Sequence, residues 1–169
     1  MRNHLRPYVV SLAICTIAGV AYAGMGSPHF ISSSDSIDPA TGDLTVSFKE
    51  AGLSNTPITY DLSANTLYEF QCFTKSGNKP QGAPNAGGPS SENTSTTITP
   101  RNGQITGSLT LDVTFPPTTA SCQGGGLKLC LTSASYTDVV LTDTTSNVVA
   151  KLNDQSVSAP SGQFIACGG

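Results

Sequence analysis

The chain has 169 residues and carries 11 Asp and Glu against 8 Lys and Arg, a formal net charge of −3 at pH 7. A mildly acidic chain with scattered cations argues against nucleic acid or an anionic membrane as a partner. Charged residues make up only 11% of the chain, whereas Ser, Thr, Gly, Asn and Pro are abundant, and this composition favours strands and turns over helices.

Residues 1–23 have the features of a secretory signal peptide. Basic residues precede an apolar stretch at 8–20, and a small-x-small cleavage site follows at 21–23. A transmembrane anchor is the weaker interpretation, because a span needs about 20 apolar residues and this stretch is shorter. Cleavage removes Arg2 and Arg6 and leaves 146 residues with a net charge of −5. We therefore expect a secreted, extracellular protein without a membrane partner.

The mature chain is expected to form one domain at 43–169, preceded by a polar N-terminal segment at 24–42. Alternation of apolar and polar residues indicates half-buried strands. The expected strands lie at 44–49, 58–63, 68–72, 105–115, 127–131, 136–142, 148–152 and 163–167. Asn102-Gly103 lies between an extended segment at 94–99 and the strand that begins at Ile105, and it is typical of a tight type I′ hairpin. Short strands separated by turn residues predict an all-β, antiparallel sandwich, loosely immunoglobulin-like and stapled by disulfides.

Four cysteines remain after the signal peptide is removed, and an even number in a secreted chain predicts two disulfides with three available connectivities. The pairs Cys72–Cys122 and Cys130–Cys167 are favoured. A Cys122–Cys130 bridge stays open as an alternative, although a glycine run and an extended segment separate these two residues. A zinc site is disfavoured because the chain has no C-x-x-C pair, and no cofactor is expected.

A 19-residue stretch at 75–93 is rich in Gly, Pro, Asn and Ser and has no large apolar side chain. Loops of this length are usually functional or disordered. A polar recognition surface would use Lys75, Asn78, Lys79, Gln81 and Asn85, with Phe73 as an exposed aromatic neighbour. The alternative is a loop with no partner, shielded by a glycan on Asn93 of the acceptor Asn93-Thr94-Ser95.

Other candidate sites have simpler interpretations. Asp35, Asp38 and Asp43 carry hard oxygen ligands that suit calcium, but their spacing matches no EF-hand loop and is ordinary turn chemistry.

The mature chain's one histidine, His29, falls in the polar N-terminal segment, which disfavours a Ser-His-Asp triad. The carboxylates available to a hydrolase occupy outward or edge positions of strands, where a soluble sheet needs polar residues. These carboxylates are Asp61, Glu69, Asp112 and Asp138.

Several motifs occur in an order that resembles a group of small secreted β-rich proteins of fungi and actinobacteria without an assigned activity. The motifs are the strand and turn at 44–55, Cys72 with Gly77-Asn78-Lys79-Pro80, Asn102-Gly103, Cys122, and the segment 135–143. The resemblance covers about residues 40–150 and consists of turn and strand signatures. It implies that Cys72 and Cys122 are the shared disulfide and that Cys130 and Cys167 form an extra one.

The sequence therefore predicts a non-catalytic secreted protein, a monomer, that contacts a cell-wall or cell-surface component through the 75–93 loop. A hydrolase that uses strand-borne carboxylates is an alternative from a different class. A structural surface or matrix protein is a third, for which self-association along an edge strand would be expected.

Overall fold

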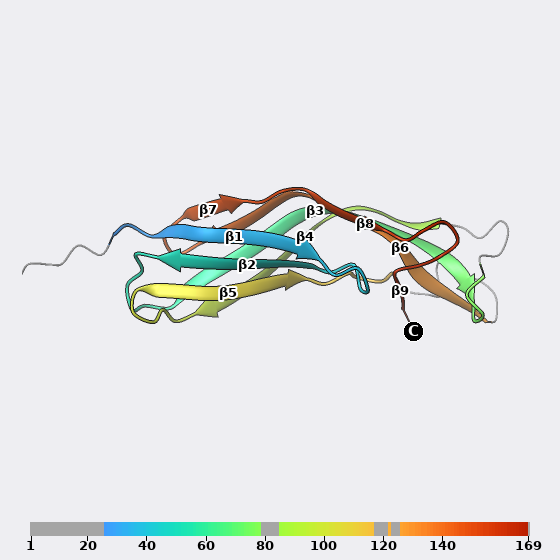
Figure 1. The fold of residues 1–169 in the computed structure, drawn as a ribbon, viewed down its shortest axis with the longest axis horizontal. Coiled ribbons are helices and arrows are strands. Elements are labelled where there is room, and N and C mark those ends of the chain that lie inside the picture. The colour runs from blue at the N-terminus through green and yellow to red at the C-terminus, as the bar shows by residue number, and fades with distance from the viewer. Residues whose placement is uncertain (1–25, 79–84, 117–121, 123–125, 169) are drawn as a thin grey trace, which may run out of the picture.

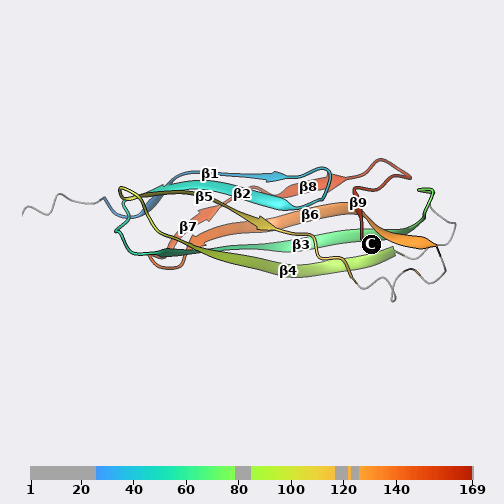
Figure 2. The same cartoon turned by 90° about the horizontal axis from the view of Figure 1, so that it is seen from below.

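The structure is a computed structural model that describes residues 26–78, 85–116, 122 and 126–168, and nothing is described of the Asn85 and Ala86 side chains. The predicted signal peptide lies outside these residues and stays a prediction. The described part is all-β, with antiparallel sheets and two disulfides, as predicted. Figures 1 and 2 show an elongated molecule in which one sheet lies over the other.

The first sheet has the strand order β1-β2-β5, and the second has the order β4-β3-β6-β7, with β8 and β9 also paired to β6. The strands of the first sheet are β1 (His29–Ile37), β2 (Leu44–Ala51) and β5 (Gln104–Leu111). Those of the second are β3 (Ile58–Thr74), β4 (Asn85–Ile98), β6 (Leu127–Asp143), β7 (Val148–Lys151), β8 (Gln155–Ser158) and β9 (Ala166–Cys167).

The core lies between the two sheets and follows the predicted alternation. Along β2, residues 44, 46 and 48 are buried, and along β3 the even-numbered residues from Ile58 to Cys72 are buried. Burial of each large apolar side chain contributes about 1.5–3 kcal/mol, so this inner layer supplies most of the favourable free energy of folding. Its largest fully buried side chains include Tyr60, Tyr136 and Phe70.

The polar N-terminal segment at 24–42 contains a strand that belongs to the domain, which corrects the predicted boundary at 43. Strand β1 pairs with β2 from His29↔Ala51 to Ile37↔Leu44. Its inward side carries Phe30 and Ile37 but also polar residues between them. The sequence of β1 therefore shows no alternation of apolar and polar residues from which a strand could be predicted. Backbone pairing with β2 supplies the missing stabilisation.

The 75–93 loop is also different from the prediction. Residues from Asn85 onward form β4, which pairs with β3 from Gln71↔Asn85 to Ile58↔Ile98, and residues 79–84 lie outside the described residues. At Gly87, with φ +117°, a Cβ would collide with the Tyr68 carbonyl. Glycine is therefore required there by the close approach of the strands, although in the sequence it indicates a loop.

The turn at Asn102-Gly103 is confirmed, because both residues have positive φ, at 53° and 72°. Arg101 and Gln104 bond to each other on either side of it. The predicted hairpin is wrong, however, because the strands on the two sides of the turn do not pair: β4 belongs to the second sheet and β5 to the first. The turn is therefore a corner between the two sheets.

Two fully buried carboxyl groups connect the sheets, Glu50 of β2 and Asp143 of β6. Tyr60 donates a 2.7 Å hydrogen bond to Glu50 Oε2, and the Thr145 and Ser146 N–H groups donate to Asp143 Oδ1. No described group donates to Glu50 Oε1 or Asp143 Oδ2, and the two carboxyl groups interact with each other.

Burial raises the pKa of Glu50, and the nearby Asp143 raises it further, while the Tyr60 bond and His29 act in the opposite direction. The folded state holds the proton of the Glu50 carboxyl more tightly than the unfolded chain does. The contribution of Glu50 to stability is therefore fully present below its unfolded pKa. The contribution is lost as the pH rises through the raised folded value.

We expect the free energy of unfolding of Glu50→Gln to fall less steeply with rising pH than that of the unmodified protein. One proton accounts for a slope of at most about 1.4 kcal/mol per pH unit. Urea unfolding from pH 4.5 upward measures the slope. Glu69→Gln, which alters an exposed carboxyl of β3, is the matched control. Equal slopes in Glu50→Gln and the unmodified protein would contradict the raised pKa of Glu50.

Candidate functional site

The chain beyond β3 forms an ordered turn at 74–78. Thr74 N–H donates to the Asn78 carbonyl at 2.8 Å, and Asn78 N–H donates to Thr74 Oγ1 at 3.1 Å. Lys75 and Asn78 are exposed on this turn. Two other predicted recognition residues, Lys79 and Gln81, lie outside the described residues. Asn85 begins β4.

Phe73 is not the exposed aromatic side chain that the sequence suggested, since it is 1% exposed. Its ring packs edge-on against Phe164, with 5.1 Å between the ring centroids. Phe164 is itself 40% exposed. The exposed ring at this end of the molecule is therefore Phe164, from the segment before β9, and the buried Phe73 holds it in place.

A polar groove of about 350 Å³ lies beside this aromatic pair, on the outer face of the second sheet. Its floor is formed by Glu69 and Gln71 of β3 with Thr132 and Ser133 of β6, and its wall by residues 158–163. The floor residues offer carboxylate, amide and hydroxyl groups side by side. This groove, together with Phe164, is called the polar groove below.

The floor contains an irregularity of the sheet. Glu69 pairs with Ser133 and Phe70 with Leu131, so Thr132 is an additional residue in β6. Its hydroxyl donates to the Glu69 carbonyl at 3.0 Å. Such bulges redirect side chains, and they are over-represented next to functional sites.

The wall is held at both ends by β6. Ala159 N–H donates to the Thr132 carbonyl at 2.8 Å, and Ile165 N–H donates to the Leu131 carbonyl at 2.8 Å. Between these bonds, Gln163 N–H donates to the Pro160 carbonyl and closes a turn. The wall is thus positioned by the backbone before any ligand arrives, which lowers the entropic cost of binding.

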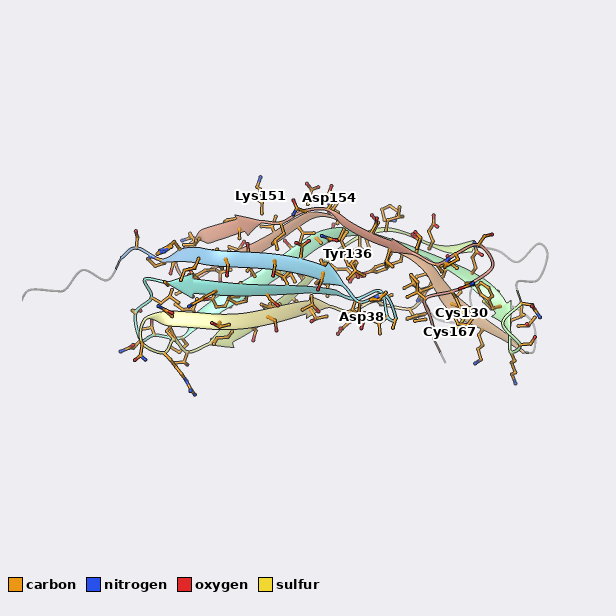
Figure 3. All side chains as sticks on the ribbon, in the orientation of Figure 1. Asp38, Cys130, Tyr136, Lys151, Asp154 and Cys167 are labelled. Atoms are coloured by element: carbon orange, nitrogen blue, oxygen red, sulfur yellow. A yellow bond between two sulfur atoms is a disulfide. The ribbon has the colours of Figure 1, made fainter. Side chains whose placement is uncertain are left out.

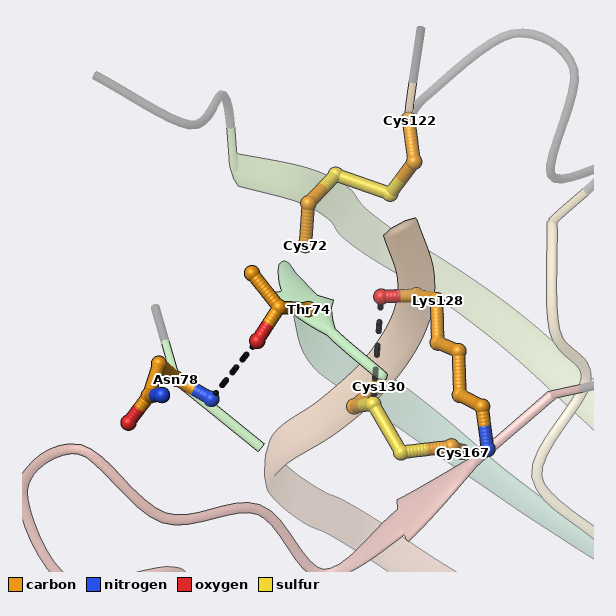
Figure 4. The surroundings of a disulfide bond; sticks show 7 residues. All are labelled: Cys72, Thr74, Asn78, Cys122, Lys128, Cys130 and Cys167. Atoms are coloured by element: carbon orange, nitrogen blue, oxygen red, sulfur yellow. Dashed lines mark hydrogen bonds between the residues drawn. A yellow bond between two sulfur atoms is a disulfide. The ribbon is translucent and has the colours of Figure 1, made fainter. Parts of the chain in front are cut away.

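The Cys130–Cys167 disulfide fastens the segment that follows the wall. It joins residues that pair directly across β6 and β9, and Figures 3 and 4 show it at the same end of the molecule as the turn at 74–78. The Cys72–Cys122 disulfide is also present, so the favoured connectivity is confirmed. Cys72 belongs to the inner face of β3 and Cys130 to the outer face of β6, so the two disulfides fasten opposite sides of the second sheet.

The carboxylates considered for a hydrolase do not come together. Asp61 and Glu69 lie eight residues apart on one strand, which is about 27 Å at strand spacing. Asp138 accepts a 2.9 Å bond from Asn65, midway between them, and Asp112 follows β5 in the other sheet. A glycosidase needs its two carboxyl groups within about 5–10 Å, and these four residues supply no such pair.

The three aspartates considered for calcium have separate structural roles. Asp38 Oδ1 accepts from Ala40 N–H within the β1–β2 turn, and Asp43 Oδ1 accepts from Val113 N–H at 2.7 Å. Asp35 lies on β1. Throughout the described residues, no group of three or more His, Cys, Asp and Glu side chains is arranged to hold a metal ion.

Two further predicted residues are placed on strands. His29 begins β1, and its Nδ1 atom lies 2.8 Å from the Ser27 carbonyl. Asn93 is exposed on β4, where it pairs with Ser63, so the acceptor sequence lies within a strand and not at the end of a loop.

No protein-family model matches the chain, and no curated protein matches it. The ranges covered by the structure hold no helix long and apolar enough to cross a bilayer. The two disulfides indicate folding in an oxidising compartment.

We expect the double variant Cys130→Ala/Cys167→Ala to lose about 4 kcal/mol of stability, the chain-entropy value for a bridge that spans 37 residues. Amide hydrogen exchange should accelerate most in the groove wall, because the wall then depends on a few backbone bonds. The pair Cys72→Ala/Cys122→Ala is the control, with a similar global loss but without the selective acceleration at 158–163. Equal exchange of the wall in both variants would show that the Cys130–Cys167 bridge does not hold it.

Proposed function

We propose that the protein is a secreted, non-catalytic binding protein, and that the polar groove holds a chain of neutral sugars from a cell wall or cell surface. The observation that carries the proposal is the groove itself, a preorganised polar surface whose last lining residue, Gln163, is followed directly by the exposed ring of Phe164. This replaces the 75–93 loop as the expected contact surface, since most of that segment's described residues belong to β4.

Sugars present two kinds of surface to a protein. Their hydroxyl groups exchange hydrogen bonds with amide, hydroxyl and carboxylate side chains, which Gln71, Ser133 and Glu69 supply. The C–H faces of their rings pack on aromatic side chains, which Phe164 supplies. Specific sites of this kind combine apolar contact with a few placed polar groups.

Secretion is supported by the apolar leader at 1–23 and by the two disulfides. The absence of a close pair among Asp61, Glu69, Asp112 and Asp138 favours binding over hydrolysis. Glycosylation of Asn93 is compatible with its exposed position on β4.

We expect the mature protein to be retained on at least one insoluble polysaccharide among chitin, cellulose, β-glucan and mannan, and Phe164→Ala to weaken this retention by about tenfold. Loss of an aromatic contact of roughly 1.4 kcal/mol produces that factor. A depletion isotherm on the insoluble polymer measures the affinity. Because the variant also exposes Phe73, Gln71→Ala in the groove floor serves as a second test.

Val149→Ala is the matched control, since Val149 is 54% exposed on β7 away from the groove. Its retention should equal that of the unmodified protein. Retention with chelator should equal retention with calcium. Failure to bind any of the four polymers, or equal weakening by the control, would overturn the proposal and favour a protein partner or a structural role.

A further inference from the structure

A second pocket, of about 370 Å³, lies where β5 begins. Figure 1 shows that β5 begins near the end of the molecule opposite to β9. It is lined by Lys49 of β2, by Thr99 and Arg101 before the corner turn, and by Gln104 and Thr106 of β5. Ile98 and Ile105 also border it, but Ile105 is buried in the core between the sheets and Ile98 packs against that core. We call it the Lys49–Arg101 pocket.

The strand pairing explains why these side chains converge. Lys49 pairs with Thr106 across β2 and β5, and Arg101 pairs with Gln104 across the corner turn. Paired residues of antiparallel strands point to the same face, and so do residues two apart on one strand. The two cations therefore flank β5 from opposite sides, each about 4.8 Å from it in the pairing direction, with an amide and a hydroxyl between them.

The charge of the surroundings is the second observation. Among the lining residues that the structure describes, Lys49 and Arg101 are the charged ones and none is a carboxylate, although the chain has more Asp and Glu than Lys and Arg. On the outer face of the first sheet, the neighbouring side chains along β1, β2 and β5 are hydroxyl-bearing. They are Ser32, Ser34, Ser36, Thr45, Ser47, Ser108 and Thr110.

The side chains that line this pocket offer more hydrogen-bond donors than acceptors. Glu50, the acidic neighbour of Lys49, points to the opposite face, where Tyr60 and Asp143 bind it. A guanidinium and an ammonium group without a carboxylate beside them, together with amide and hydroxyl donors, form a site of positive potential in an otherwise acidic molecule. Charge-assisted hydrogen bonds from such groups are about twice as strong as neutral ones.

We propose that the Lys49–Arg101 pocket binds an oxyanion, a phosphate, sulfate or carboxylate group. Arg101 contributes planar paired donors, Lys49 a compact charge, and Gln104 and Thr106 the neutral donors between them. The site is independent of the polar groove and does not rest on the sugar-binding proposal.

The probes are sodium phosphate and sodium sulfate, titrated into the ¹⁵N-labelled mature protein at constant ionic strength. We expect saturable amide shifts confined to residues 49, 99 and 101–106. Lys49→Gln/Arg101→Gln should weaken the binding at least about tenfold, because two charge-assisted donors are lost. The dispersion of the amide spectrum verifies that the variant is folded.

The matched control is Lys128→Gln/Lys151→Gln, which removes two cations of the second sheet that lie outside the pocket. Figure 3 shows Lys151 projecting from the edge of the molecule. Equal weakening by this pair would show general charge screening and would overturn the proposal. Absence of saturable shifts with both anions at millimolar concentration would also overturn it.

A third titration with an oligogalacturonate distinguishes the source of the anion. Tighter binding of the oligosaccharide than of free phosphate or sulfate, with the same residues shifted, would assign the pocket to the acidic groups of a glycan. Tighter binding of the free anions would assign it to a small inorganic ligand. Both results support an oxyanion site, and neither depends on Phe164 or on retention by neutral polymers.

Discussion

The antiparallel pairing of β3 with β6 is the interaction on which the rest of the structure depends. Each strand has 17 residues, whereas the strands of the first sheet have eight or nine. The first sheet therefore covers only part of the inner face of the second. Where it ends, Phe115 packs on Phe70 at 5.0 Å between ring centroids, and the Cys72–Cys122 disulfide joins the same inner face. The outer face of the same overhanging part carries the polar groove.

Alternation identified strands whose inward residues are large and apolar, such as Leu44, Val46 and Phe48. It failed for β4, whose inward residues include Gly88, Ser90 and Glu92, because a strand that is stabilised by pairing with a long neighbour needs little apolar surface of its own. It also divided β3 in two, because Thr66 is polar in sequence but is buried with its hydroxyl bonded to Ser90. The alternation of apolar and polar residues therefore predicts which side chains face the core, but it does not predict which strands pair with one another.

The candidate sites likewise include features that the sequence predicts and features that it does not. The disulfide pairs could be inferred from four cysteines and the residues between them, because a covalent constraint admits only three solutions. The burial of Phe73 could not be inferred from the sequence, because the ring that covers it belongs to Phe164. Phe164 is distant in the chain and follows a turn in which apolar and polar residues do not alternate. Likewise, Glu50 and Asp143 meet only because β2 and β6 face each other across the core. A site whose residues come from several strands can be predicted only if the pairing register between those strands is known. Patterns within one sequence do not give that register.

The length of β3 also determines the order in which its two edges are covered during folding. Its partner β4 follows immediately and pairs in a hairpin, but β6 pairs at separations that increase from Thr74↔Leu127 to Tyr60↔Asp143. Contacts so distant in the chain close late, because the entropy of a long loop must be overcome first. One edge of β3 therefore stays open until the C-terminal third of the chain has been made. The hydroxyl-rich composition of β4 suits such an interval, because a polar strand offers an incomplete sheet little apolar surface for aggregation.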